Sequence, residues 1–157
     1  METFELLNKS NIHELKELME NDDMVFDIDK LKEFVSTQNA YGFIYRAEGK
    51  PIGFAYGCCL LMPNGLKELY LHSIDILPQY QNKGYGNKFF KSILDFAKEN
   101  GFYDLFLSSS QSLQGACHMY EKHGGLRACD DEIIFHYPFV DSHFLLDSQE
   151  ACASVRV

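Results

Sequence analysis

Residues 69–86 read LYLHSIDILPQYQNKGYG and decide the fold. The first half is rich in branched and aromatic residues, which is typical of a strand, and Pro78 ends it. Gly84 and Gly86 then let the backbone curl so that successive N–H groups point at one spot. The helix predicted to begin there adds its unpaired amides and the positive end of its dipole. The stretch therefore predicts a strand, an anion-binding turn and a helix in direct succession, although a tight turn alone would also explain the two glycines.

Two common nucleotide motifs do not fit this turn. A dinucleotide-binding fingerprint would need a third glycine where Phe89 stands, and a Walker loop would need Gly-Lys followed by Ser or Thr. The turn suits a phosphate group, but it belongs to neither of these two classes.

The segments that follow alternate between helix and strand. Apolar residues at positions 89, 90, 93, 94 and 97 predict an amphipathic helix over 84–100 that ends at Gly101. Residues 105–107 predict a buried strand, a stripe from Leu113 to Tyr120 predicts a helix ended by Gly124 and Gly125, and 132–137 predict a further strand. The tail from 138 to 157 has no clear pattern.

The segments that precede it predict hairpins and two short helices. Asn11 with Glu14 predicts a capping box for a helix that ends near Asn21, and a second helix is expected around 28–37. Strands are expected at 3–7, 41–47, 52–62 and 67–77, with turns at 48–51 and 63–65. Antiparallel hairpins followed by alternating strands and helices predict a mixed α/β sheet in one domain over 1–157.

The composition narrows the class of protein. The 157 residues carry 14 Lys+Arg and 23 Asp+Glu, a formal charge of -9, which disfavours a nucleic-acid or anionic-membrane partner. Five cysteines without C-x-x-C spacing predict neither a disulfide framework nor a zinc site, and no other metal is expected. The first residues lack the basic and apolar pattern of a signal peptide. We therefore expect a reduced, soluble, cytoplasmic protein, and we leave open whether it is a monomer or a homodimer.

The strand, the Gln-x-x-Gly-x-Gly turn at 81–86 and the amphipathic helix resemble motif A of the GNAT family of N-acetyltransferases, over about 67–100. Ala116 and Tyr120, followed by Glu-Lys-His-Gly, resemble the family's motif B over about 104–125. The resemblance implies the GNAT fold, a central and mostly antiparallel mixed sheet splayed in the middle and flanked by about four helices. It also implies an enzyme that transfers an acetyl group from acetyl-CoA to a primary amine of a small molecule or peptide by direct attack.

The resemblance assigns the binding of acetyl-CoA to two segments. Backbone groups of Ile74 and Ile76, with Asp75 between them, would pair with the pantetheine arm. The pyrophosphate would lie on Gln81, Asn82, Lys83, Gly84, Tyr85, Gly86 and Asn87. One departure is Leu113, where the family often has an Asn that bonds the pantetheine, so either Ser110, Gln111 or Gln114 replaces that contact or the contact is missing.

Acetyl transfer to an amine requires a base, because alkylamines are protonated at neutral pH. The two-residue period of the strand at 67–77 places Glu68, Tyr70, His72, Ile74 and Ile76 on one face, with Asp75 opposite unless a bulge rotates it. His72 is a candidate base, because histidine accepts a proton near neutral pH, and a buried histidine bonded to a carbonyl is the equal alternative. Glu68 is the second candidate, and its alternative is a charge at the strand end.

Tyr120 is expected to protonate the departing thiolate, as the resemblance to motif B implies. An ordinary core tyrosine is its alternative. The loss of the Asn at Leu113 also leaves open a non-catalytic module that binds acyl-CoA, and a protein acetyltransferase would share every motif. An aminoglycoside acetyltransferase is a further option, although the acidic pair that such enzymes carry just before the alanine of motif B is Leu113-Gln114 here. Acidic residues at 20, 22, 23, 27 and 29 could attract a cationic amine, although a solvated surface explains them as well.

Overall fold

The computed structural model describes residues 1–127 and 155–156. They belong to two units, of which the first spans residues 1–107 with Arg156 and the second begins at Ser108 and includes Val155. The strand predicted at 132–137 lies outside the described residues.

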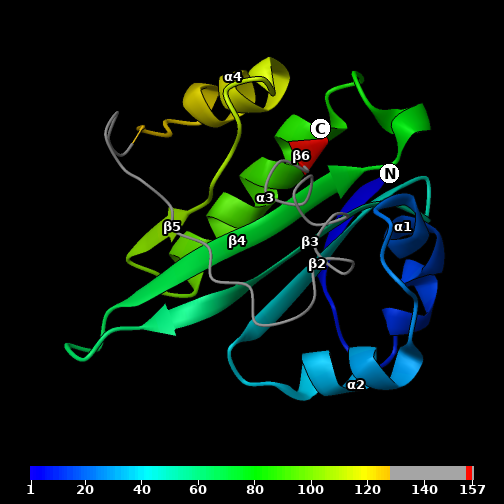
Figure 1. Cartoon of the computed structure of the whole chain (residues 1–157), viewed down its shortest axis with the longest axis horizontal. Coiled ribbons are helices and arrows are strands. Elements are labelled where there is room, and N and C mark those ends of the chain that lie inside the picture. Colours follow the sequence, from blue (N-terminus) through cyan, green and yellow to red (C-terminus); the bar gives the residue numbers. More distant parts are fainter. Residues whose placement is uncertain (128–154, 157) are drawn as a thin grey trace, which may run out of the picture. The chain divides into compact units, whose positions relative to one another are not determined.

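The first unit is built on a mixed sheet (Figure 1). Five strands follow each other in the order β1-β2-β3-β4-β5, and the two-residue β6 pairs with β4 off this path. The first three pairings are antiparallel, whereas β4 and β5 are parallel. The predicted mixed and mostly antiparallel sheet is therefore confirmed. The strands are β1 (Glu2–Leu6), β2 (Ala40–Ala47), β3 (Lys50–Leu61), β4 (Lys67–Ile76), β5 (Asp104–Phe106) and β6 (Val155–Arg156).

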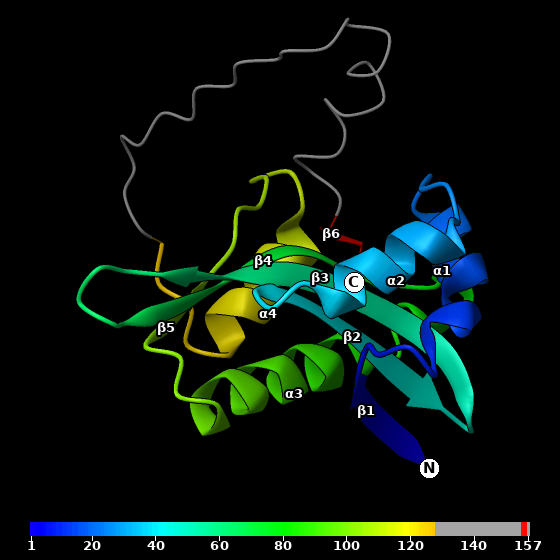
Figure 2. The same cartoon turned by 90° about the horizontal axis from the view of Figure 1, so that it is seen from below.

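Helices cover both faces of this sheet, as Figure 2 shows. On one face, the 3-10 turn η1 (Ile12–Leu15) and the helices α1 (Lys16–Asn21) and α2 (Ile28–Ser36) bury a core against Ile44 and Phe54. On the other face, α3 (Tyr85–Glu99) packs its own aromatic residues against the sheet, with the rings of Phe43 and Phe96 5.1 Å apart. A second 3-10 turn, η2 (Pro78–Tyr80), leads from β4 toward α3.

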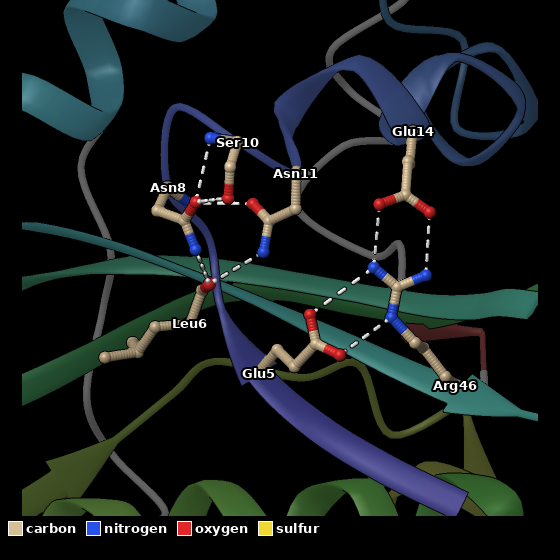
Figure 3. Close-up of polar contacts among 7 residues, drawn as sticks. All are labelled: Glu5, Leu6, Asn8, Ser10, Asn11, Glu14 and Arg46. Atoms are coloured by element: carbon tan, nitrogen blue, oxygen red, sulfur yellow. Dashed lines mark hydrogen bonds and ion pairs between the residues drawn. The ribbon is translucent and has the colours of Figure 1, made fainter. Parts of the chain in front are cut away.

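The corner after β1 corrects one prediction (Figure 3). Asn11 does not form a capping box with Glu14, because its Oδ1 accepts from the backbone of Asn8 and its amide group donates to the carbonyl of Leu6. Glu14 instead forms a two-pronged ion pair with Arg46 of β2, which also contacts Glu5 of β1. This long-range pairing replaces the predicted local cap, and the helix there is a 3-10 turn followed by the short α1.

A bulge interrupts β4 halfway along its pairing with β3. Gly57 pairs with Leu71 while its neighbour Tyr56 pairs with Ser73, so β4 holds one extra residue, His72. The two backbones approach closely there, because a Cβ built on Gly57 would lie 1.9 Å from the carbonyl oxygen of Tyr70. Only glycine fits at this position of β3, and the bulge depends on it.

β5 accompanies β4 over a short distance only. Their register comprises Glu68 with Asp104, Leu69 with Leu105 and Tyr70 with Phe106. Beyond Tyr70, β4 has no pairing with β5, which ends at Phe106, and the splay of the sheet stays a prediction. The expectation of a buried strand at 105–107 is wrong, because Leu105 and Leu107 are only half-buried and Phe106 is 40% exposed.

The second unit contains α4 (Gln114–Lys122). Its end follows the prediction, because Gly124 has φ +88° and the N–H of Gly125 donates to the carbonyl of Tyr120. Its start is the loop 108–113, in which the hydroxyls of Ser110 and Ser112 lie 2.8 Å apart.

Candidate active site

The bulge changes which residues of β4 share a face. Ser73 and Asp75 pair with Tyr56 and Phe54 and lie on the α1–α2 face, whereas Ile76 pairs with Gly53 and faces α3. The predicted common face of Glu68, Tyr70, His72, Ile74 and Ile76 is therefore wrong beyond His72, because the extra residue reverses the alternation. Asp75, expected on the opposite face in a regular strand, shares the face of His72 and Tyr70.

His72 is exposed, and its ring is held from two sides by aromatic residues. The hydroxyl of Tyr70 lies 3.1 Å from Nδ1 of His72, and the centre of the Tyr56 ring lies 5.2 Å from that of the imidazole. The alternative of a buried histidine bonded to a carbonyl does not hold. The arrangement fixes the ring through one nitrogen and leaves Nε2 for a substrate.

Asp75 is buried next to this pair. Its carboxylate accepts a hydrogen bond from the hydroxyl of Ser73 at 2.9 Å, and the residue is 6% exposed. Burial raises the pKa of Tyr56 to about 12, and the negative charges of Asp22 and Asp75 add to this effect. Negative charge is thus concentrated around the Tyr56 hydroxyl, close to His72.

Glu68 lies at the other end of the same face. It is half-buried and pairs with Leu60 on β3 and with Asp104 on β5. Glu68 lies four positions before His72, about 13 Å along a regular strand at about 3.3 Å per residue. At this spacing the two candidate bases would not contact the same nitrogen directly.

The glycine turn after η2 has the geometry of an anion cradle. Gly84 has φ +84° and Asn82 has φ +59°, and a Cβ built on Gly84 would meet no atom within 4 Å. α3 begins at Tyr85 without a side-chain cap, and Lys88 is the first residue whose amide donates to a carbonyl four residues back, that of Gly84. The amides of Tyr85, Gly86 and Asn87 are thus the ones that a helix leaves for an anion.

Two residues of the predicted cradle support the loop itself. Gln81 donates from its backbone to Pro78 and from its side chain to the carbonyl of Ile76 at 2.7 Å. Lys83 donates from its ammonium to the carbonyl of Gln79 at 2.7 Å. Gln81 therefore joins the loop to the end of β4.

The cradle fits a phosphate-bearing ligand such as the coenzyme A that the resemblance implies. The buried side-chain oxygen of Asn87 has no hydrogen-bond partner among the described residues. A buried amide without a partner is costly unless a ligand or water satisfies it. Asn87 lies on the first turn of α3, three residues after Gly84, so the loop and the start of the helix offer their hydrogen-bonding groups in the same place.

A cavity of about 390 Å³ opens on the α1–α2 face of the first unit. It lies between the segment that joins α1 to α2 and strand β3, and Tyr56 forms part of its wall. The same ring contacts His72, so the cavity and the candidate base are neighbours.

Tyr120 lies in the second unit, where it is 8% exposed on α4. Cys117 on the same helix donates from its thiol to the carbonyl of Ser110 at 3.4 Å, which agrees with a packing role. The backbone of Leu113 also donates to Ser110, so this serine is engaged in the loop that precedes α4.

Sequence reasoning missed Tyr56 and gave no role to Tyr70. Strand period did place Tyr70, two residues before His72, on the face of the imidazole. Tyr56 gave no such signal, because its position opposite the bulge depends on the register of β3 with β4.

Residues 3–125 match the sequence profile described as the acetyltransferase (GNAT) family. No curated protein matches the sequence significantly. Several solved structures share the fold at low identity. An aminoglycoside acetyltransferase from an uncultured soil metagenomic sample has a TM-score of 0.72 at 17% identity, covering 89% of this chain and 97% of that chain.

Two further structures agree with this comparison. The ribosomal-protein-alanine N-acetyltransferase from Brucella melitensis biovar Abortus 2308 has a TM-score of 0.71 at 18% identity, covering 87% of this chain and 99% of that chain. An aminoglycoside N-acetyltransferase solved in complex with CoA has a TM-score of 0.70 at 17% identity, covering 89% of this chain and 96% of that chain. Among the residues described for this chain, no helix has the length and apolar character needed to cross a membrane.

Proposed function

This chain belongs to the acetyltransferase (GNAT) family, and on that premise we propose that it acetylates a primary amine with His72 as the base. The observation that carries the proposal is the position of His72, exposed on β4 with Tyr70 at Nδ1 and the cavity wall at its side. With the proton on Nδ1, the imidazole donates to the Tyr70 hydroxyl and keeps the lone pair of Nε2 for the ammonium group of the acceptor. Glu68 lies too far along β4 to share this role directly, and we assign it to the edge of the active site.

Acetyl-CoA supplies the acetyl group as a thioester. We propose that the cradle at 82–87 holds its pyrophosphate, with Gln81 fixing the loop to β4, and that the splay beyond Tyr70 gives backbone groups of Ile74, Asp75 and Ile76 access to the pantetheine arm. A backbone amide of this segment would polarise the thioester carbonyl.

The proton balance of the reaction requires two groups. His72 takes a proton from the acceptor ammonium, the free amine forms its bond to the carbonyl carbon, and the carbon–sulfur bond breaks. Tyr120 gives a proton to the departing sulfur and regains the second proton, which the nitrogen loses as the amide forms, and His72 releases its proton to solvent. The acceptor is an amine of a small molecule or a peptide. No metal takes part, and no nucleic acid or membrane is a partner. We also place the protein in the cytoplasm, where Cys58, Cys59 and Cys117, all unpaired, would stay reduced.

A thiol-release assay with acetyl-CoA and a panel of amines tests this function. Replacing His72 by Gln keeps a polar side chain beside Tyr70 but removes the base, so kcat/KM should fall by roughly 10²–10⁴-fold. The acidic limb of the pH–rate profile should disappear with it. Glu68→Gln is the matched control on the same strand face, and we expect a much smaller loss.

Isothermal titration with CoA separates binding from catalysis. His72→Gln should bind CoA as the parent does, because the cradle lies on another segment. If the parent binds CoA but releases no thiol with any amine of the panel, the chain is a non-catalytic acyl-CoA-binding module. If Glu68→Gln rather than His72→Gln abolishes turnover, the assignment of the base is wrong.

A further inference from the structure

The cavity on the α1–α2 face is large enough for a small molecule and is lined mainly by apolar side chains. Its volume of about 390 Å³ lies within the range of small-molecule sites. Most of the side chains that line it are apolar or aromatic: Met19, Met24, Val25, Leu31, Phe34, Phe54 and Tyr56. Among the described residues, charged side chains enter its lining at Asp27 and Lys30, and one oxygen of Asp27, Oδ1, accepts from the amides of Asp29 and Lys30 at the start of α2.

The aromatic residues of the cavity form a continuous path to His72. The Phe34 ring meets that of Tyr56 edge-on at 6.5 Å, and the Phe54 ring stacks on Tyr56 at 5.5 Å. Tyr56 in turn lies 5.2 Å from the imidazole. A ligand in the cavity would therefore rest on the same ring that His72 contacts.

Charge is distributed unevenly along this path. The buried carboxylate of Asp75 lies on the Tyr56 side, because it is bonded to Ser73, which pairs with Tyr56. Elsewhere Met24 and Leu31 line the cavity, and the negative charge of Asp27 is offset there by the ammonium group of Lys30. One ammonium group near His72 would therefore meet negative charge, whereas a second one among the apolar side chains would lose its water and face Lys30 as well as Asp27.

We infer that the acceptor is an amine with a single cationic head and an apolar body, whose body fills the cavity between α1, α2 and β3 while its amino group reaches His72. This inference rests on the proposed function and names its substrate class. It separates the acceptor from polycations such as aminoglycosides and polyamines. Tyr56 is the positioning residue that joins the apolar site to the base.

Two probes of matched length test the inference. Hexylamine and 1,5-diaminopentane differ in that a terminal methyl group is replaced by a second amino group. We expect kcat/KM for hexylamine to exceed that for 1,5-diaminopentane at least tenfold. From propylamine to hexylamine, each added methylene should raise kcat/KM about two- to fourfold, as expected for the burial of one such group.

Methionine methyl groups report binding independently of turnover. Of the five methionines, Met19 and Met24 line the cavity, and Met62 lies at the β3–β4 turn. In protein labelled with ¹³C at the methionine methyl groups and saturated with CoA, hexylamine should shift the Met19 and Met24 signals and leave that of Met62 unchanged. Met24→Lys should abolish the preference for hexylamine, whereas Leu61→Lys, which introduces a lysine at a 66% exposed position outside the cavity lining, should preserve it.

The outcomes separate the two proposals. If 1,5-diaminopentane or an aminoglycoside is acetylated better than hexylamine and the Met19 and Met24 signals do not move, the inference is overturned while the proposed function stands. If hexylamine shifts both signals and no amine is acetylated, the cavity binds as inferred and the proposed function fails. If hexylamine shifts neither signal and is not acetylated, the inference is overturned.

Discussion

Replacing Gly57 by Ala should destabilise the protein more than any other single-methyl addition at a described glycine. The built Cβ lies 1.9 Å from the carbonyl oxygen of Tyr70 and 2.9 Å from its carbonyl carbon, whereas ordinary contact begins at 3.4 Å. Both neighbours are backbone atoms and cannot rotate away, so β3 and β4 must separate by about 1.5 Å. Overpacking of this kind costs about 1–3 kcal/mol.

Separation of the strands also weakens the hydrogen bonds beside the bulge. At about 1 kcal/mol for each of one or two bonds, the free energy of unfolding should fall by about 2–5 kcal/mol in total. For a chain of this size each kcal/mol corresponds to about 2–4 °C in Tm, so we expect a drop of roughly 4–20 °C. Urea denaturation followed by circular dichroism, with a thermal melt, measures both quantities.

Gly115→Ala is the matched control, because a Cβ there would meet no atom within 4 Å. It adds the same methyl group within α4, where alanine is favoured over glycine by up to about 1 kcal/mol. The Gly57→Ala variant should also lose acetyl transfer, because the bulge sets the position of His72. A Gly57→Ala protein that melts within 1 °C of the parent, or that keeps full turnover, would refute the dependence of the bulge on glycine.

Three further predictions concern other parts of the molecule. Arg46→Met leaves Glu5 and Glu14 without their shared cation and should cost about 2–3 kcal/mol at pH 7. Arg46 holds the pKa of Glu14 below its ordinary value, so the contribution of this ion pair is present above about pH 4.3 and is lost as the pH falls through the lowered pKa. Urea denaturation should therefore give parent and variant the same free energy of unfolding in acid. A difference that persists there would contradict the pairing. Gly84→Val places a branched side chain at φ +84° and should weaken CoA binding at least tenfold by calorimetry, whereas Gly65→Val, at φ +85° in an equally open turn, should leave it unchanged; equal affinities would locate the cradle elsewhere. Tyr120→Phe should lower kcat by roughly tenfold to hundredfold with CoA affinity and Tm unaltered, and parental turnover would make Tyr120 a core residue.

Short-range sequence preferences predicted the elements whose structure depends on neighbouring residues. The succession of strand, turn and helix at 69–86, the left-handed Gly84 and the ends of α3 and α4 at Gly101 and Gly124 all follow from short-range preferences, and the structure confirms them. The start of the N-terminal helix was not predicted correctly, because Glu14 forms its ion pair with Arg46, which lies 32 positions away in the sequence.

The faces of β4 show the same limit at the candidate site. Period-two alternation placed Glu68, Tyr70 and His72 together, and this part holds. It failed at Ile74 and Ile76, because the bulge arises from the approach of Gly57 on another strand. The cavity likewise needs α1, α2 and β3 at once, so no local pattern could have located it. The role of Tyr120 stays a prediction.

The cavity wall and the anion cradle are encoded by separate stretches of the chain. Residues 19–34 with part of β3 line the cavity, whereas residues 82–87 form the cradle. If the cavity takes the acceptor and the cradle takes CoA, as proposed, substitutions in the cavity lining would change the acceptor preference and leave CoA binding unchanged. Tyr56 differs from the other lining residues, because its ring also contacts His72. Substitutions that change the preferred amine without loss of turnover should therefore be found within residues 19–34 and not at Tyr56.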